Sequence, residues 1–173
     1  MDLSLPQAYL IGLLVLLGGA AVLVGRQILR VRRDETALAR LEAQAKQSEQ
    51  STADLYELAS VQLRKRLYGQ AVDSLKRASK SAASEPPEAQ ALIENALGFA
   101  LAAQNNYNAA VKHYRAALRA KADYPVALNN LAYALEKQQK PDEAMATYQQ
   151  VLELDVNNRT ARKRLKRLER IAA

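Results

Sequence analysis

Residues 97–118, LGFALAAQNNYNAAVKHYRAAL, match residues 131–152, LAYALEKQQKPDEAMATYQQVL, at an offset of 34 positions. Small and large side chains recur at the same places in both stretches, for example Tyr114 with Tyr148. A third copy, LASVQLRKRLYGQAVDSLKRAS, occupies residues 58–79 at an offset of 39. A period of this length is typical of a chain built from stacked, similar units.

The repeated unit is predicted to be a pair of helices, which makes the chain all-α. Alanine is the strongest helix former, and glycine and proline number only 6 and 5. The five extra residues of the first interval fall between 81 and 90, where Pro86 and Pro87 interrupt a helix. Small residues at two fixed positions let the paired helices approach closely: Ala59, Gly98 and Ala132 on the first helices, and Ala71, Ala110 and Ala144 on the second.

Large apolar residues between these positions are expected to fill the core around each close contact. They are Leu55, Leu58, Leu75, Leu97, Leu101, Tyr114, Leu128, Leu131, Leu135 and Tyr148. This pattern resembles the tetratricopeptide repeat, with repeats at 52–85, 91–124 and 125–158 forming a right-handed α-solenoid. Where that repeat usually has a large aromatic residue early in its first helix, this chain has Leu55, Glu94 and Leu128.

Residues 1–25 are predicted to be a transmembrane anchor. The run from Leu3 to Gly25 carries no charge, and as a helix it would span about 34 Å, enough for a hydrocarbon core of about 30 Å. A cleaved signal peptide is the competing interpretation, but it needs a positive start, and this chain offers only Asp2 there. Four arginines follow the run within residues 26–33 and favour retention of the following domain on the side of synthesis.

Residues 26–51 form a basic edge and a linker that is expected to continue as helix toward the first repeat. Its apolar residues Val31, Leu38, Leu41 and Ala45 form a stripe that hints weakly at a coiled coil. Self-association through this stripe is possible but not favoured.

Residues 159–173 are predicted to be a basic helix that caps the stack, with an apolar stripe and seven basic residues against one acidic residue. The candidate basic surface is Lys163, Arg167 and Arg170. It can be a solvated cap, a contact with an anionic membrane surface, or a contact with an acidic partner protein. Nucleic acid is not expected, because residues 34–158 are slightly acidic although the whole chain carries +7.

An enzymatic function is not expected. The chain has no cysteine and a single histidine, His113, so thiolate chemistry and a histidine-rich metal site are excluded. No glycine-rich phosphate loop or metal-ligand spacing is present, and no cofactor is predicted. His113 is expected to be a surface or partly buried helix residue.

A groove lined by the first helices is the candidate binding site. The candidate residues are Tyr56, Asn95, Phe99, Asn129 and Tyr133, with Ser60, Leu63, Ala102 and Glu136 beside them. Asparagines can bond an extended peptide backbone and aromatic rings bury area at low entropy cost, although packing and solvation alone explain these residues as well. The lysine and asparagine set that clamps a C-terminal carboxylate in some proteins of this fold is replaced here by Tyr56, Ser60 and Ala96.

The whole chain resembles the membrane-anchored tetratricopeptide proteins of cyanobacteria and plastids that assist photosystem I assembly. The resemblance covers the anchor with its basic edge (YLIGLLVLLGGAAVLVGRQILRVRRDE), the three repeats and the basic end. It implies a single-pass thylakoid protein with a lumenal N-terminus and a stromal or cytoplasmic repeat domain. It also implies photosystem I subunits or assembly intermediates as partners. Apart from the resemblance, an adaptor for a bacterial secretion or envelope complex fits the same features.

Overall fold

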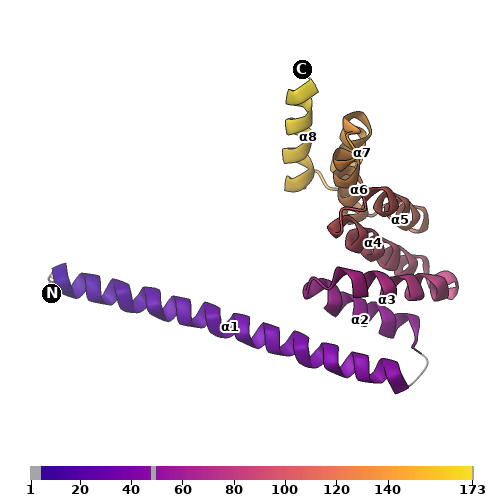
Figure 1. Cartoon of the computed structure of the whole chain (residues 1–173). Helices are drawn as coiled ribbons and strands as arrows, with labels where there is room; N and C mark the ends of the chain where they lie inside the picture. The colour runs from indigo at the N-terminus through magenta and orange to yellow at the C-terminus, as the bar shows by residue number, and fades with distance from the viewer. Residues whose placement is uncertain (1–4, 48–49, 173) are drawn as a thin grey trace.

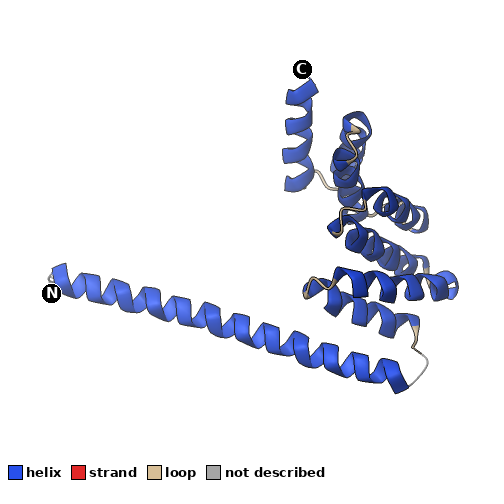
Figure 2. Ribbon diagram, in the orientation of Figure 1, coloured by secondary structure: helices blue, strands red, loops and turns tan. Residues whose placement is uncertain are grey.

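A computed structural model describes residues 5–47 and 50–172, and the described part of the chain is entirely helical. Residues 1–4 of the expected anchor, 48–49 of the linker, 173 of the cap and the Ala45 side chain lie outside the described residues. Figures 1 and 2 show a stack of helix pairs from which one long helix projects. The elements are α1 (Leu5–Gln47), α2 (Thr52–Arg64), α3 (Tyr68–Ser81), a 3₁₀ turn (Ala82–Ser84), α4 (Pro87–Ala103), α5 (Tyr107–Ala120), α6 (Pro125–Lys137), α7 (Pro141–Leu154) and α8 (Arg159–Ala172).

Three helix pairs, α2–α3, α4–α5 and α6–α7, form the body, and α8 packs on α7. The predicted core is buried: each of the ten large residues is at most 7% exposed, and the alanines at the small positions are fully buried. The second pair begins at Pro87 rather than at 91, because a proline without an N–H is well suited to the first turn of a helix. The expected repeat boundary at 91 therefore lies inside α4.

Gly98 provides the closest contact within a pair. A Cβ at this position would lie 2.7 Å from the ring carbons Cδ1 and Cε1 of Tyr114, which is 1% exposed. The glycine thus makes room for a buried tyrosine ring rather than for backbone alone.

The turn inside each helix pair has the same backbone geometry. Arg66, Asn105 and Gln139 have φ values of 60°, 62° and 60°, and the residue after each donates its N–H to a carbonyl five residues back. This is the Schellman ending, which satisfies the last carbonyls of the first helix. The backbone therefore repeats with the 39- and 34-residue offsets of the sequence.

The C-terminal half of α1 packs against α2 and covers that end of the stack. Leu41 is 4% exposed and forms a small core with Leu58 and Val61, which also contacts Ala37 and Leu38. Arg64 of α2 forms an ion pair with Asp34 of α1 at the other edge of the contact, with 3.0 Å between Nε and Oδ1. Leu41, in the stripe that hinted at a coiled coil, is thus buried within the chain.

Among the described side chains, the N-terminal half of α1 contains no buried apolar residue. Its apolar side chains from Tyr9 to Val31 are exposed, and α1 is the one helix in the described residues long and apolar enough to cross a membrane, by length and composition. Figure 1 shows this half as an arm that extends well beyond the repeats.

Candidate protein-interaction surface

The first helices of the pairs lie on the inner side of the stack. α2 contacts α4, and α4 contacts α6, across consecutive pairs. Three positions on each of these helices are equivalent by the 39- and 34-residue offsets of the repeats, and their residues are called here the inner ladder. They are Tyr56, Ser60 and Leu63 on α2; Asn95, Phe99 and Ala102 on α4; and Asn129, Tyr133 and Glu136 on α6.

The helix α8 continues this arrangement as a fourth first helix. Its buried residues Ala161 and Leu165 stand 34 positions after the buried Ala127 and Leu131. The same offset applied to Asn129, Tyr133 and Glu136 leads to Lys163, Arg167 and Arg170, which therefore extend the inner ladder. The basic end thus continues the same series of positions along the stack.

A hydrogen-bonded amide pair links the second and third repeats. Asn130 Nδ2 donates to Asn95 Oδ1 at 3.0 Å, and Asn95 Nδ2 donates to the Tyr124 hydroxyl at 3.4 Å. Burial, followed by the neighbouring Tyr56 phenol, raises the pKa of Tyr124. Asn95 is therefore engaged within the protein and is not free for a peptide backbone. Asn129 Oδ1, in contrast, is buried without a hydrogen-bond partner in the described residues.

Tyr133 lies at the centre of an aromatic and cationic group. The Tyr107 ring meets it edge-on, with centroids 6.4 Å apart and planes at 80°. Lys137 Nζ lies 5.5 Å and Arg164 Cζ 4.6 Å from its centroid. Cations over a tyrosine face are attracted by the ring quadrupole. The ring of Tyr133, on α6, therefore contacts side chains of both α5 and α8.

Glu136 fastens α8 to α6. Its side chain is 6% exposed and accepts hydrogen bonds from the Tyr148 hydroxyl at 2.7 Å, from Arg164 Nη1 at 3.3 Å, and from Arg167. Burial and the hydrogen bond to this carboxylate raise the pKa of Tyr148. Three donors compensate the buried charge of this carboxylate. Removal of one donor would leave that charge less well compensated and would destabilise the fold.

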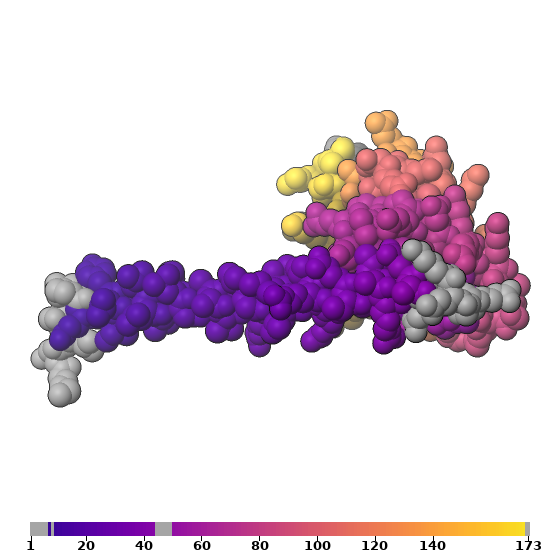
Figure 3. All heavy atoms as spheres, turned by 60° about the horizontal axis from the view of Figure 1, so that its bottom comes forward, coloured from indigo at the N-terminus to yellow at the C-terminus, as the bar shows by residue number. Residues whose placement is uncertain are grey.

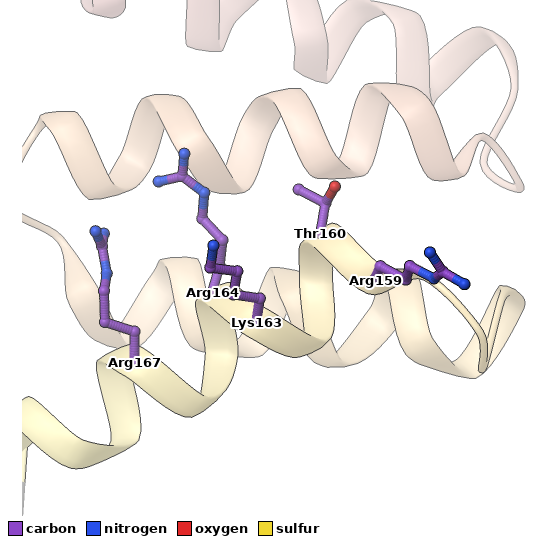
Figure 4. Close-up of a pocket in the computed structure, with 5 residues that line it drawn as sticks. All are labelled: Arg159, Thr160, Lys163, Arg164 and Arg167. Atoms are coloured by element: carbon purple, nitrogen blue, oxygen red, sulfur yellow. The ribbon is translucent and has the colours of Figure 1, made fainter. Parts of the chain in front are cut away.

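A shallow pocket of about 420 Å³ lies along α8, lined by Arg159, Thr160, Lys163, Arg164 and Arg167. Figure 4 shows Arg164 and Arg167 extending side by side from α8, while Arg159 points away from them. Arg164 and Arg167 are occupied by Glu136. Arg159 and Lys163, which form no ion pair among the described residues, are therefore the free cations of this pocket.

Glu94 forms a polar junction of three helices outside the inner ladder. It accepts a hydrogen bond from Ser79 Oγ at 2.5 Å and lies 2.7 Å from His113 Nδ1. Burial alone would raise the pKa of Glu94, but the hydrogen bonds from His113 and Ser79 outweigh it and hold that pKa below its usual value. The sole histidine is therefore a half-buried structural partner, and no cluster of three metal-ligating residues occurs among the described residues.

The candidate residues differ in accessibility. Phe99 is 45% exposed and is the most open apolar member of the inner ladder. Tyr56 and Tyr133 are half-buried, and Tyr56 also lines a small apolar pocket with Leu92 and Ile93. Of the basic residues, Arg167 contacts Glu136, while Lys163 and Arg170 are exposed and line a further shallow hollow along α8.

Sequence reasoning missed four residues of this surface. They are Tyr107, Tyr124, Asn130 and Arg164. Tyr107 and Tyr124 stand next to helix boundaries, where the repeat pattern does not specify the type of residue. Arg164 could have been found, because the 34-residue offset projected past the third repeat places a fourth first helix at 159–172.

Comparison with known proteins agrees with this architecture. The family profile described as tetratricopeptide repeat matches residues 101–168. Over 146 residues the chain is 30% identical to ycf37 of Cyanophora paradoxa, and the match covers 84% of each protein. The chain belongs to the ycf37 family of tetratricopeptide-repeat proteins. The chain also matches the chloroplastic tetratricopeptide protein PYG7 of Arabidopsis thaliana, to which it is 31% identical over 163 residues. That match covers 94% of this chain and 54% of PYG7, so the chain spans about half the length of PYG7.

Solved structures share the fold of this ycf37-family chain. MamA superposes with a TM-score of 0.73 at 17% identity, over 80% of this chain and 78% of MamA. The first tetratricopeptide domain of Spaghetti (RPAP3), bound to the HSP90 peptide SRMEEVD, gives a TM-score of 0.65 at 21% identity, over 71% of this chain and 97% of that domain. At these identities the likeness establishes the tetratricopeptide fold.

Proposed function

We propose that this protein is a non-catalytic scaffold, tethered to the thylakoid membrane by α1, that assists assembly or stabilisation of photosystem I. The observation that carries the proposal is the combination of an exposed apolar helix with a repeat body docked on its far half. That combination supports a role in which a protein-binding surface is held close to a membrane. The resemblance of the sequence to photosystem I assembly proteins supports the choice of partner, and the chloroplastic relative PYG7 supports a photosynthetic membrane.

The proposed contact is the inner ladder, with the exposed Phe99 and the half-buried Tyr133 as the main apolar anchors. Aromatic side chains supply large contact area with few rotatable bonds and are enriched at binding hot spots. Lys163 and Arg167 extend the same surface and would contribute orientation and association rate.

Co-purification from solubilised membranes tests this proposal. Phe99→Ala should reduce the recovery of photosystem I subunits about tenfold, because hot-spot truncations cost upward of about 1 kcal/mol. The matched control is Leu154→Ala, which removes an apolar side chain of similar exposure, 49%, from α7 outside the inner ladder. Apolar contacts should resist added salt, whereas contacts through exposed charges weaken.

Two outcomes would contradict the proposal. If Phe99→Ala retains full recovery while Lys163→Glu/Arg170→Glu, at two exposed positions, loses it in a salt-dependent way, the contact lies on α8 instead. If envelope or secretion proteins co-migrate with the wild-type protein on native gels and photosystem I subunits do not, the protein is an adaptor for another membrane complex.

A further inference from the structure

Four basic residues form a straight row on the side of α8 that faces away from α7, and two of them, Lys163 and Arg170, are also residues that extend the inner ladder. Arg159, Lys163, Lys166 and Arg170 are spaced by four, three and four residues, so they share one face of the helix. The opposite face is buried through Ala161, Leu165 and Leu168. The four basic residues, called here the outward ridge, are all exposed.

Glu169 of α8 lines the same hollow as Lys163, Lys166 and Arg170, but it forms no ion pair with the outward ridge in the described structure. No side-chain hydrogen bond or ion pair joins any of its four members to another described residue, whereas their neighbours Arg164 and Arg167 are engaged by Glu136. Four like charges in a row repel one another, and an external anionic surface would relieve that repulsion. The charge pattern therefore calls for an extended anionic partner rather than for a single carboxylate.

The arrangement of the helices indicates where this partner lies. Figures 1 and 3 both show α8 at the end of the body that is nearer the N-terminus along α1, and Figure 1 shows α8 running across the direction of α1. If α1 crosses a bilayer, α8 thus lies along the bilayer surface, with its ridge on the side away from α7.

The contact between α1 and α2 sets the depth of the body. Asp34, paired with Arg64 at the end of α2, is nine residues beyond Gly25, or about 13 Å along a helix. The headgroup layer outside the hydrocarbon core is about 5–8 Å thick, so this end of the body lies just outside the headgroups. A collar of exposed arginines on α1 occupies the same zone: Arg26, Arg30, Arg32 and Arg33.

We propose that the outward ridge rests on the anionic lipid headgroups of the same membrane that α1 spans. The ridge and the arginine collar then hold the body at two separate points, which prevents it from swinging about the anchor. This inference depends on the proposed anchoring by α1 and not on photosystem I. Basic clusters beside a transmembrane helix gain attraction from anionic lipid in the same way.

The test uses the full chain in lipid nanodiscs of phosphatidylcholine, with and without phosphatidylglycerol. Because the chain has no cysteine, Ile171→Cys provides a unique site for a fluorophore at the exposed end of α8. A nitroxide on the lipid headgroup should quench this label in anionic discs, and added salt should reverse the quenching. Ser81→Cys, at the far end of α3, supplies a label that should remain unquenched.

Neutralising the ridge should release α8 from the surface. Each charge removed should weaken surface association about fivefold, so Arg159→Gln/Lys163→Gln/Lys166→Gln/Arg170→Gln should abolish the lipid-dependent quenching. The matched variant, Lys76→Gln/Arg77→Gln/Lys80→Gln/Lys112→Gln, removes four exposed charges from second helices and should leave it unchanged.

Equal quenching in neutral and anionic discs, or in the ridge variant and the wild type, would overturn the inference and leave an acidic protein as the partner of the ridge. Failure of the chain to co-purify with any disc would instead disprove the anchoring by α1. The photosystem I proposal is tested separately by co-purification, so the three outcomes are distinguishable.

Discussion

At the scale of single residues, tight packing and buried polar pairs determine which positions can change. Gly98 lies against the ring of Tyr114, so even one methyl group would have to displace a buried side chain. Gly69, in α3, has only Gln104 Nε2 near its virtual Cβ, at 3.9 Å. The two glycines are both helical, but they differ in the space around them.

Alanine at these two glycines should therefore have opposite effects. Gly98→Ala should lower the free energy of unfolding by about 1–3 kcal/mol, because the overpacking cost exceeds the gain in helix propensity. Gly69→Ala should raise it by about 0.4–1 kcal/mol, since the unfolded chain loses freedom without any clash. Urea unfolding of the full chain in detergent, followed by circular dichroism, measures both. Equal shifts of the same sign would show that the ring of Tyr114 does not pack at Gly98.

The pairing of Glu94 with His113 and Ser79 should make stability depend on acid. Because the pKa of Glu94 is below its ordinary value of 4.5 in the folded protein, its contribution is present above pH 4.5 and is lost as the pH falls through the folded pKa. Glu94→Gln should cost about 1–2 kcal/mol near neutral pH and much less in strong acid. The control is Glu153→Gln, which alters an exposed carboxylate of α7. A constant difference between Glu94→Gln and wild type at every pH would contradict this role.

At the scale of elements, each end of the stack is covered by a helix of different chemistry. The first end is covered by α1 through the small apolar core of Leu41, Leu58 and Val61. The last end is covered by α8, which is held by its apolar stripe and by the buried Glu136. A stack of repeats requires such ends, because an unpaired repeat would expose its core.

Leu41→Ala should loosen α1 from α2 without unfolding the repeats. Truncation of a buried leucine costs about 2–5 kcal/mol, and here the loss falls on one small contact. Limited proteolysis in nanodiscs should then cut the docked half of α1 faster, while the far-ultraviolet circular dichroism of the body stays unchanged. Leu29→Ala, at a position 65% exposed, is the control and should leave the cleavage rate as it is. Unaltered cleavage in Leu41→Ala would mean that this core does not hold the two helices together.

At the scale of the whole molecule, charge is arranged along the direction of α1. An uncharged, exposed helix comes first, the arginine collar follows, and the body carries its basic ridge on the side nearer the N-terminus. Positive residues resist transfer across the membrane during insertion, so this order favours a body that stays on the side of synthesis.

The orientation can be measured on sealed vesicles. Protease added to vesicles that expose the cytoplasmic or stromal face should degrade residues 34–173 and leave a small protected fragment from the apolar half of α1. Vesicles of the opposite orientation should protect the body, which provides the control. Protection in the first case would reverse the proposed topology, and a soluble body with a cleaved N-terminus would remove the anchor.

The sequence by itself determined the features that depend on local periodicity. The 34-residue offset predicted helix pairs, the small positions and the buried leucines and tyrosines, because helix geometry forces such residues to recur at set intervals. The uncharged run before the arginines likewise predicted a helix able to span a membrane. These properties can be inferred from spacing and residue type without knowledge of any distant contact.

Only the tertiary structure decided which distant side chains meet. Glu136 is bonded by Arg164 and Arg167 across about 30 positions, Asn95 pairs with Asn130 rather than with Asn129, and Leu41 is buried on α2. Each of these contacts depends on how the helices are rotated, and the polar ones also depend on side-chain rotamers. The repeat pattern specifies neither of these. The 34-residue offset aligns the basic end with the inner ladder, but only the structure shows that Arg164 and Arg167 reach the buried Glu136 of α6.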